Sequence, residues 1–377
     1  MSFNLIRNSR VFFTTNVNAE TGVVAATGFL PTNTYELQVL DGFSFSQTTN
    51  NETVTLNEGG AAPVRGQRSF NTSLEPVDFS FTTYMRPADG GTNITAEESV
   101  LWNALFGTGA IGGAGAAWSE SATKATVVAA NSNAHQLQKF GLIILVDSVS
   151  YIVDNCVLDT ATIDFGLDAI ANIAWNGKGR VLRQIEGLTA NNASPVVFGS
   201  GLTGTSKAKN TTAPYIANKL STLQVKKAIG GSGTAFNVAL TGGSLTISNN
   251  VTYLTPANIG VVNQPTTYFT GTRSISGSVT AYLRAGAANT AGLLADLLAS
   301  STSDTDPEFF IQIEVGGLAN ATRVEFKMPA TVLSIPSVST EQVVSTEISF
   351  TAQGSTGSAF DIAAANELEV SYYTPNV

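Results

Sequence analysis

Cysteine and histidine are almost absent from this chain of 377 residues, which has one of each, Cys156 and His135. A disulfide framework and a zinc cluster both need several such residues, so both are excluded. A Cys–His or Ser–His–Asp site would have to use the single histidine, and no nucleophile is recognisably placed for it. His135 lies in a polar stretch and Cys156 in a strand-like run, so we expect a surface side chain and a small buried one.

Charge and long apolar runs are scarce as well. Charged residues make up 12% of the chain, against about 25% in an ordinary soluble protein. The net charge of −9 argues against a protein that holds nucleic acid by neutralising its phosphates. The longest strongly apolar run, Phe140 to Val146, is far shorter than the ~20 residues of a membrane-spanning helix. The first residues lack the apolar segment of a signal peptide, so we expect a soluble protein made inside the cell.

Two parts of the chain resemble each other in sequence. VDFSFTTYMRP, starting at Val77, matches ISGSVTAYLRA, starting at Ile275, with Tyr84 and Tyr282 in equivalent positions 198 apart (282 − 84). LDTATIDFGLDAIANIAW, starting at Leu158, matches LSIPSVSTEQVVSTEISF, starting at Leu333, without a gap. We interpret the chain as a tandem duplication of residues 1–187 and 215–377. The segment between them, residues 188–214, is rich in Ser, Thr, Asn and Gly, as linkers are.

Each half has the sequence pattern of a β-rich unit with one helix. In Val77–Tyr84 apolar and polar residues alternate, which predicts a strand with one buried face. Thr95 and Glu98 match a capping box at the start of a helix, and the second half offers an apolar stripe of Leu293, Leu294, Leu297 and Leu298. We therefore expect a mainly β protein: two tandem β-sandwich domains, each flanked by one α-helix.

Several short motifs match catalytic or binding patterns, but none has the required context. The GxGxxG pattern from Gly107 follows a predicted helix instead of a strand, and SxxK from Ser121 lacks its companion motifs. The aspartates from Asp147 to Asp168 do not form a calcium loop. We therefore expect no enzyme activity, no metal and no cofactor, and a function in assembly.

The segment from Tyr35 to Pro87 resembles the tail tube proteins, or major tail proteins, of tailed bacteriophages. The DGFSFS strand, the VTLNE stretch, the PVRG turn and the PVDFSFTTYMRP strand stand in that family's order, followed by the TAEESVLWNALF helix and the TIDFGLDAIANIAWNG segment. The resemblance covers most of residues 10–187 and, through the duplication, residues 215–377. The doubling departs from the many tail tube proteins that carry one such domain.

This resemblance implies a structural protein of the phage tail, made in the host cytoplasm. It implies β-sandwich domains in rings of six, whose strands close an intersubunit β-barrel around a channel for DNA, and a hairpin loop that reaches the next ring. Here the loop would span about Thr48 to Arg68, with Glu52, Glu58, Arg65 and Arg68. Because the chain is doubled, we expect trimeric rings with pseudo-sixfold symmetry. The resemblance also implies contacts with tape measure and tail terminator or baseplate proteins, and no membrane or specific DNA binding.

A channel that passes DNA without retaining it should be neutral or anionic. We therefore expect acidic residues to face the channel, the candidates being Glu75, Asp78, Asp164 and Asp168. Which of them face the channel depends on which face of each strand is turned toward it, and a register error of one residue would move them all to the opposite face.

Three other classes remain open at this point. Another virion component, such as a sheath or decoration protein, would share the composition. A β-rich carbohydrate-binding module should have a signal peptide and clustered exposed aromatics, whereas Trp102, Trp118 and Trp175 are scattered. An outer-membrane barrel would need export and regular alternation over strands of ~10 residues.

Overall fold

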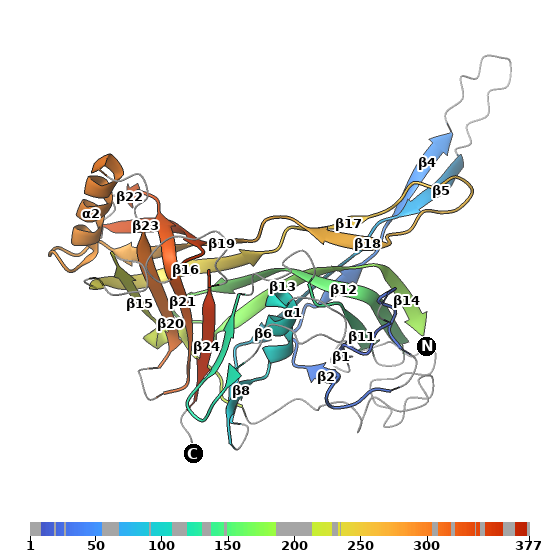
Figure 1. Cartoon of the computed structure of the whole chain (residues 1–377), viewed down its shortest axis with the longest axis horizontal. Coiled ribbons are helices and arrows are strands. Elements are labelled where there is room, and N and C mark those ends of the chain that lie inside the picture. The colour runs from blue at the N-terminus through green and yellow to red at the C-terminus, as the bar shows by residue number, and fades with distance from the viewer. Residues whose placement is uncertain are drawn as a thin grey trace, which may run out of the picture.

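The fold is mainly β, with two α-helices among the residues described, in a computed structural model (Figure 1). The structure describes residues 9–18, 20–25, 28–54, 68–89, 92–107, 119–129, 137–146, 149–185, 213–227, 233, 235–303, 308–317, 321–335, 337–339, 344–356 and 366–374. The predicted fold class is thereby confirmed at the level of secondary structure. The predicted linker, residues 188–214, lies almost wholly outside the described residues.

The described elements of the first half of the chain are strands of different lengths and one helix. They are β1 (Ser9–Thr14), β2 (Thr34–Leu37), β3 (Ser44–Ser46), β4 (Thr49–Val54), β5 (Arg68–Leu74), β6 (Val77–Tyr84), β7 (Pro87–Asp89), β8 (Ile94–Ala96), α1 (Ser99–Phe106), β9 (Ser119–Glu120), β10 (Ala125–Val128), β11 (Phe140–Val146), β12 (Val149–Asp164), β13 (Asn172–Gly179) and β14 (Val181–Ile185).

Elements of the second half follow a short 3-10 helix. They are η2 (Asn218–Leu220), β15 (Thr222–Lys226), β16 (Ala235–Ser248), β17 (Val251–Leu254), β18 (Thr267–Thr270), β19 (Ser274–Tyr282), α2 (Thr290–Ser303), β20 (Phe309–Gly316), β21 (Arg323–Leu333), β22 (Ser337–Ser339), β23 (Ser345–Gln353) and β24 (Glu369–Tyr373).

The strands of both halves pair in the same order. In the first half the neighbours run β3, β6, β13, β12, β11, β1 and β2. In the second half they run β16, β19, β23, β21, β20 and β15, and β15 returns to the first part of β16. The long strand β16 thus takes the places of both β2 and β3.

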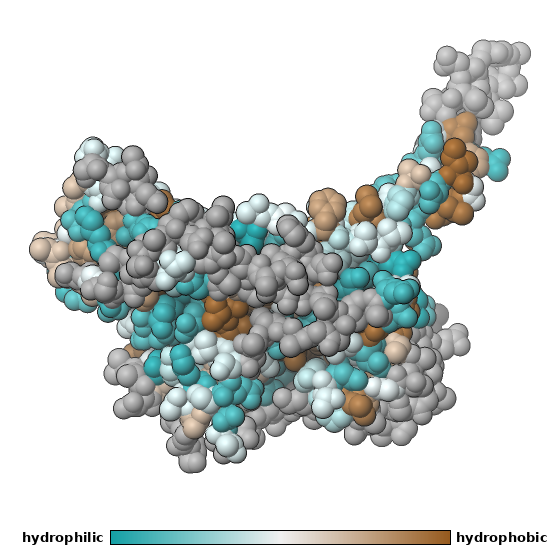
Figure 2. Space-filling view, viewed as in Figure 1, coloured by the Kyte–Doolittle hydropathy of each residue, from teal (hydrophilic) through white to brown (hydrophobic). Residues whose placement is uncertain are grey.

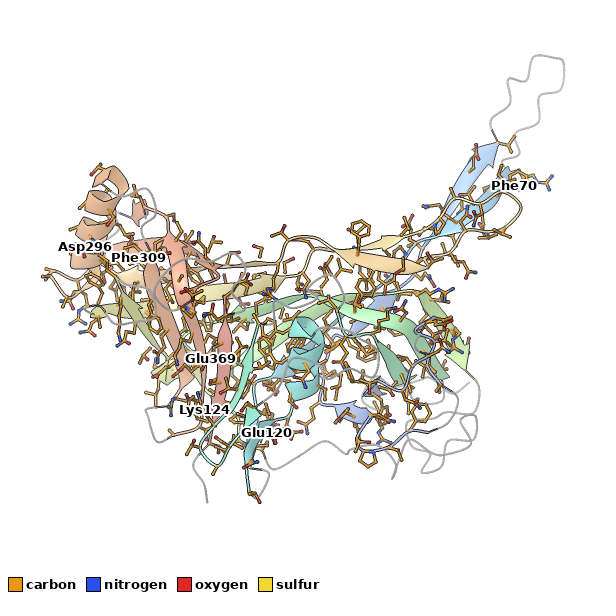
Figure 3. All side chains as sticks on the ribbon, viewed as in Figure 1. Phe70, Glu120, Lys124, Asp296, Phe309 and Glu369 are labelled. Atoms are coloured by element: carbon orange, nitrogen blue, oxygen red, sulfur yellow. The ribbon has the colours of Figure 1, made fainter. Side chains whose placement is uncertain are left out.

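Strands from the two halves also hydrogen-bond directly to each other. The end of β12 pairs with β16, from Thr160 opposite Ser248 to Asp164 opposite Ser244. At a second junction β10 pairs with β24, and Lys124, just before β10, forms an ion pair of 3.5 Å with Glu369 of β24 (Figure 3). The result is one 18-stranded sheet that includes both halves.

Aromatic side chains fill the core beneath α1. Trp102 of α1 meets Trp175 of β13 edge to face, with ring centroids 5.1 Å apart, and lies 6.4 Å from Phe326 of β21. All three are buried and belong to one cluster that contains residues of both halves. Figure 1 shows α1 lying against the sheet that carries β12 and β13. Because burial of large aromatic side chains is strongly favourable, this cluster holds the two halves together.

The predicted capping box at the start of α1 is wrong. Thr95 belongs to β8, and Glu98 is the N-cap residue and makes no side-chain cap hydrogen bond. The carboxylate of Glu98 is instead buried, where it accepts bonds from the backbone N of Arg86 and from the hydroxyl of Tyr372. Burial raises the pKa of Glu98 from 4.5 to about 7, because the charged form loses its hydration. Tertiary contacts here override a local sequence signal.

The remaining predictions of secondary structure have mixed outcomes. Phe140–Val146 is a strand buried along nearly its whole length, as predicted, and Cys156 is buried. The turn predicted near Gly166–Asp168 separates β12 from β13. In α2, Leu293 and Leu297 are buried but Leu298 is half-exposed, so the predicted four-leucine stripe is narrower than expected.

Candidate functional site: a polar sheet face and a projecting arm

Seven adjacent strands present one polar face. They are β3, β6, β13, β12, β16, β19 and β23, all joined by antiparallel pairing. In β6 Val77, Phe79 and Phe81 are buried, while Asp78 between them is exposed. The other six strands place apolar side chains on the same core side, because neighbouring strands in register share their faces. We call the opposite side the polar face.

The polar face consists mostly of hydroxyl and amide side chains. One row of paired positions runs across both halves through Ser44, Ser80, Asn176, Thr160, Ser248 and Ser274. The next row runs through Thr82, Ala174, Thr162, Thr246, Ser276 and Thr351. The hydroxyl oxygens of Ser44 and Ser80 are 2.7 Å apart and those of Thr162 and Thr246 are 3.5 Å apart. The face is therefore hydrophilic and carries few charges.

The charges on this face are mostly acidic. Asp78 is exposed on β6 and opposes Lys178 of β13. Asp164 is exposed at the end of β12, opposite Ser244. Glu347 of β23, opposite Thr280, is exposed on the same side. Sequence reasoning missed Glu347, although the alternation of buried and exposed residues along Ser345–Gln353 would have indicated it.

The four acidic residues predicted to face a channel do not lie together. Asp78 and Asp164 are on the polar face. Glu75 lies between β5 and β6, where its backbone N donates to the carbonyl oxygen of Thr48 at 2.9 Å and its carboxylate accepts from Asn50. Asp168 lies in the turn after β12 and pairs with Lys219 at 3.4 Å. Of these four residues, Asp78 and Asp164 therefore lie on the polar face, and Glu75 and Asp168 lie outside its strands.

A long hairpin, β4–β5, projects away from the body of the molecule (Figure 1). We call it the arm. Glu52 opposes Phe70 across the arm, and Arg68 opposes Val54. The guanidinium of Arg68 lies 5.1 Å from the ring centroid of Phe70, which is labelled on the arm in Figure 3. The other two predicted loop residues, Glu58 and Arg65, lie outside the described residues.

A second hairpin from the other half braces the arm. It consists of β17 and β18, and Asn263 in its loop pairs with Ser73 of the arm. The backbone N of Leu74 donates to the carbonyl oxygen of Asn263 at 2.8 Å, and the backbone N of Asn263 donates to that of Thr72 at 3.2 Å. The arm is therefore held by both halves of the chain.

Apolar side chains are exposed on both hairpins. Val54 and Phe70 are exposed on the arm, and Ile259, Val261 and Val262 are exposed in the loop of the second hairpin. Figure 2 shows hydrophobic residues among hydrophilic ones where the arm and the loop of the second hairpin overlap in the view. Exposed apolar groups that lie together on a projecting element are typical of a protein–protein contact.

The described residues contain no arrangement suited to catalysis. Burial raises the pKa of the Cys156 thiol well above its usual value, which keeps the thiol in its unreactive form. No three His, Cys, Asp or Glu side chains among the described residues lie close enough to hold a metal ion. Gly107 directly follows α1, and the rest of the glycine pattern lies outside the described residues. His135 is outside the described residues.

Comparison with known proteins decides the family. The chain is 31% identical over 364 residues to the tail tube protein pb6 of Escherichia phage T5, an alignment that covers 93% of this chain and 73% of that protein. The chain belongs to the phage tail tube protein family. No model of a protein family matches the chain.

Tail tube proteins are structural, non-enzymatic proteins of the virion that polymerise into the tube of the phage tail. The alignment with pb6 covers 93% of this chain, so the similarity extends over both halves. Among the described residues, no helix has the length and apolar composition needed to cross a membrane. The expectation of a structural tail protein is therefore confirmed, and the carbohydrate-binding and sheath alternatives are set aside.

Proposed function

We propose that three copies of this tail tube protein form each ring of the tube, and that DNA passes through the channel inside the stacked rings. In this proposal residues 1–187 and 215–377 are duplicated domains, joined by residues 188–214, and they supply adjacent parts of one barrel wall. The matching order of strand pairs in the two halves supports the duplication. The pairing of β12 with β16 supports the proposed arrangement of the wall, because it joins equivalent sheets edge to edge.

The same junction predicts the contact between neighbouring copies. Residues 44–46 of β3 correspond to residues 244–246 of β16, because they face equivalent positions of β6 and β19. The alignment of Leu158 with Leu333 makes β22 the counterpart of the end of β12. Among the described residues, β3 pairs only with β6 and β22 pairs only with β23. One edge of β3 and one edge of β22 are thus available for pairing. In the proposed ring β3 of one copy pairs with β22 of the next, which leaves neither edge exposed.

Engineered disulfides test this ring. Thr162 pairs with Thr246 at the internal junction, and the equivalent pair between copies is Ser337 with Ser46 of the next copy. Oxidised tubes of a Ser46→Cys/Ser337→Cys variant should give covalently closed trimers on denaturing gels. The matched control is Thr162→Cys/Thr246→Cys, which should cross-link within one chain. The native Cys156 is buried and gives little background. Covalent hexamers, or no cross-link where the control reacts, would overturn the ring of three.

The polar face is the proposed lining of the channel. Its hydroxyl and amide groups are uncharged and do not neutralise DNA phosphates, and the carboxylates of Asp78 and Asp164 repel them. Lys178 lies beside Asp78, so the positive charge there has an acidic neighbour. We restrict the lining to these two of the four predicted acids and add Glu347.

The two hairpins are the proposed contacts between rings. The arm projects from the body of the molecule (Figure 1), and it presents Glu52 and Arg68 together with the exposed apolar residues Val54 and Phe70. We also assign Glu58 and Arg65 to this contact. Tape measure protein inside the tube, and terminator or baseplate proteins at its ends, are the further proposed partners.

A further inference from the structure

The end of β6, in the first half, is covered by the segment that leads into β15, residues 213–217. The carbonyl oxygen of Ala213 accepts from Nε of Arg86 at 3.1 Å. The ring of Tyr215 lies 4.5 Å from the same guanidinium, and its centroid lies 5.2 Å from that of Tyr84 at an angle of 88°. The guanidinium of Arg86 is buried as a result, with the residue only 1% exposed.

The covering segment continues along the turn before β13. The backbone N of Ala171 donates to the carbonyl oxygen of Ile216 at 2.8 Å, and Ile170 pairs with Ala217. Ile216 is buried in the main core cluster. Ala171 is fully buried. Three kinds of contact therefore hold this segment: a cation over a ring, an aromatic pair and a short ladder of backbone hydrogen bonds.

The equivalent surface of the second half is uncovered. The duplication makes Tyr282 and Arg284 the counterparts of Tyr84 and Arg86. The backbone is equivalent too. The backbone N of Met85 donates to the carbonyl oxygen of Ala171 at 3.0 Å, and the backbone N of Leu283 donates to the carbonyl oxygen of Val344 at the same distance. Yet Tyr282 is 46% and Val344 is 37% exposed, and Arg284 is exposed. The surface of Tyr282, Arg284 and Val344, which we call the second-half site, has the same form and is exposed in the single subunit.

Strand register identifies the segment that fits. Leu223 of β15 opposes Ile313, and Val11 of β1 opposes Ile144, in the equivalent strands β20 and β11. Val11 and Leu223 are therefore equivalent, 212 positions apart (223 − 11). The same spacing relates Phe13 to Val225 and both are buried. Carried upstream, this spacing makes Phe3 the counterpart of Tyr215.

We propose that the second-half site binds the residues before β1 of a second copy of this chain, with Phe3 of that copy in the place of Tyr215. Phe3 lies over the guanidinium of Arg284 and against the ring of Tyr282, and the backbone after it pairs with the turn at Val344. Each copy thus latches the next one around the ring. This inference rests on the proposed ring, because only a neighbouring copy presents that segment there.

Two physical arguments favour this occupant. An aromatic ring over a guanidinium gains about 0.5–2 kcal/mol, more as the pair loses water, and an edge-to-face aromatic pair adds to this. The start of the chain, MSFNLIRN, carries Phe3, Leu5 and Ile6 within eight residues. By the spacing of 212, Phe3 takes the place of Tyr215 and Asn4 that of Ile216, and the apolar residues Leu5 and Ile6 follow directly.

Photo-cross-linking tests the contact directly. Benzoylphenylalanine replaces Phe3, and chains labelled with ¹⁴N and ¹⁵N are mixed before assembly. Tubes should yield cross-links of mixed isotope between the peptide of residues 1–7 and that of residues 274–284. The same probe in place of Tyr215 is the matched control, and it should react only within one chain, near Tyr84. The proposal would be overturned if the probe at position 3 cross-linked only to other peptides, or only within its own chain.

A double-mutant cycle measures the strength of the contact. Phe3→Ala and Arg284→Ala should each raise the critical concentration for assembly about 2- to 30-fold, as expected for one cation–π contact, and should not be additive. Phe3→Ala with Leu298→Ala, an exposed residue of α2, should be additive. Full additivity of the first pair contradicts the contact. If the Ser46–Ser337 trimer still forms, only this inference fails; if that trimer is also absent, the ring itself fails.

Discussion

The indole nitrogen of Trp102 donates a hydrogen bond of 2.8 Å to the hydroxyl of Tyr372, and that hydroxyl donates to the carboxylate of Glu98. All three side chains are buried. They connect α1, near residue 100, to β24, at the end of the described chain. Because an unpaired buried polar group is costly, opening either half breaks the network, and we expect both halves to unfold together.

Glu98 should make the stability of the subunit depend on pH. Its pKa is about 7 in the folded protein and 4.5 as a free side chain. The folded state therefore binds more protons between these values, so the contribution is full below pH 4.5 and is lost as pH rises through 7. The loss is about 3 kcal/mol. As the pH rises from 4.5 to 8, the free energy of unfolding of Glu98→Gln, measured with denaturant, should increase by about this much relative to that of the wild type. A parallel pH profile for both proteins would contradict the assignment, and Glu120→Gln is the exposed control.

Tyr372→Phe should destabilise the subunit by about 1–3 kcal/mol, because the Trp102 indole and the Glu98 carboxylate each lose a buried partner. Tyr373→Phe is the matched control, because the substitution removes a hydroxyl from the neighbouring residue but keeps the ring that lies under Arg323. The free energy of unfolding of the soluble subunit is the measurement. Equal effects of the two substitutions would show that the buried network contributes nothing specific.

Charge reversal on the polar face should slow DNA ejection. Asp78→Lys and Asp164→Lys each place a cation where the channel is proposed to be neutral or anionic, and cations bind DNA by releasing its counterions. Virions carrying either variant should assemble tubes of normal length and eject DNA more slowly, with the delay reduced by added salt. Glu120→Lys makes the same charge change on β9, away from the polar face (Figure 3). Ejection at the wild-type rate from both variants would refute a channel-facing position.

The tip of the second hairpin should be needed for stacking but not for folding. Ile259 is fully exposed, so Ile259→Asp leaves the stability of the free subunit unchanged. Burial of an isoleucine gains about 1.5–3 kcal/mol, so this variant should raise the critical concentration for tube growth about tenfold or more. Ile259→Val keeps most of the apolar surface and should assemble normally. Tubes of normal length from Ile259→Asp would place this loop outside the contact between rings.

Sequence reasoning works for this chain where the signal is local. The alternation in Val77–Tyr84 predicted which side chains are buried, and the position of Asp78 follows from it. It failed for Glu98, whose spacing from Thr95 fits a capping box. The carboxylate instead accepts a hydrogen bond from Tyr372, which lies in β24, far along the chain. It also misplaced Leu298, because the helix covers less of the core than its leucines suggested.

Contacts between distant strands left no signal in the sequence. Nothing in the residues of β12 and β16 predicts that Thr162 opposes Thr246, since pairing depends on register set by the whole sheet. The bracing of the arm through Asn263 uses backbone atoms, which any residue supplies. Glu75, another of the four candidates for the channel, lies between β5 and β6, outside the alternating stretch Val77–Tyr84 that places Asp78.

Cryo-electron microscopy of tubes assembled from the purified protein tests the ring most directly. The map should contain three chains per ring, each spanning two similar sectors of the wall, with the polar face toward the channel and the arm reaching the adjacent ring. A ring built from six complete chains would contradict the account.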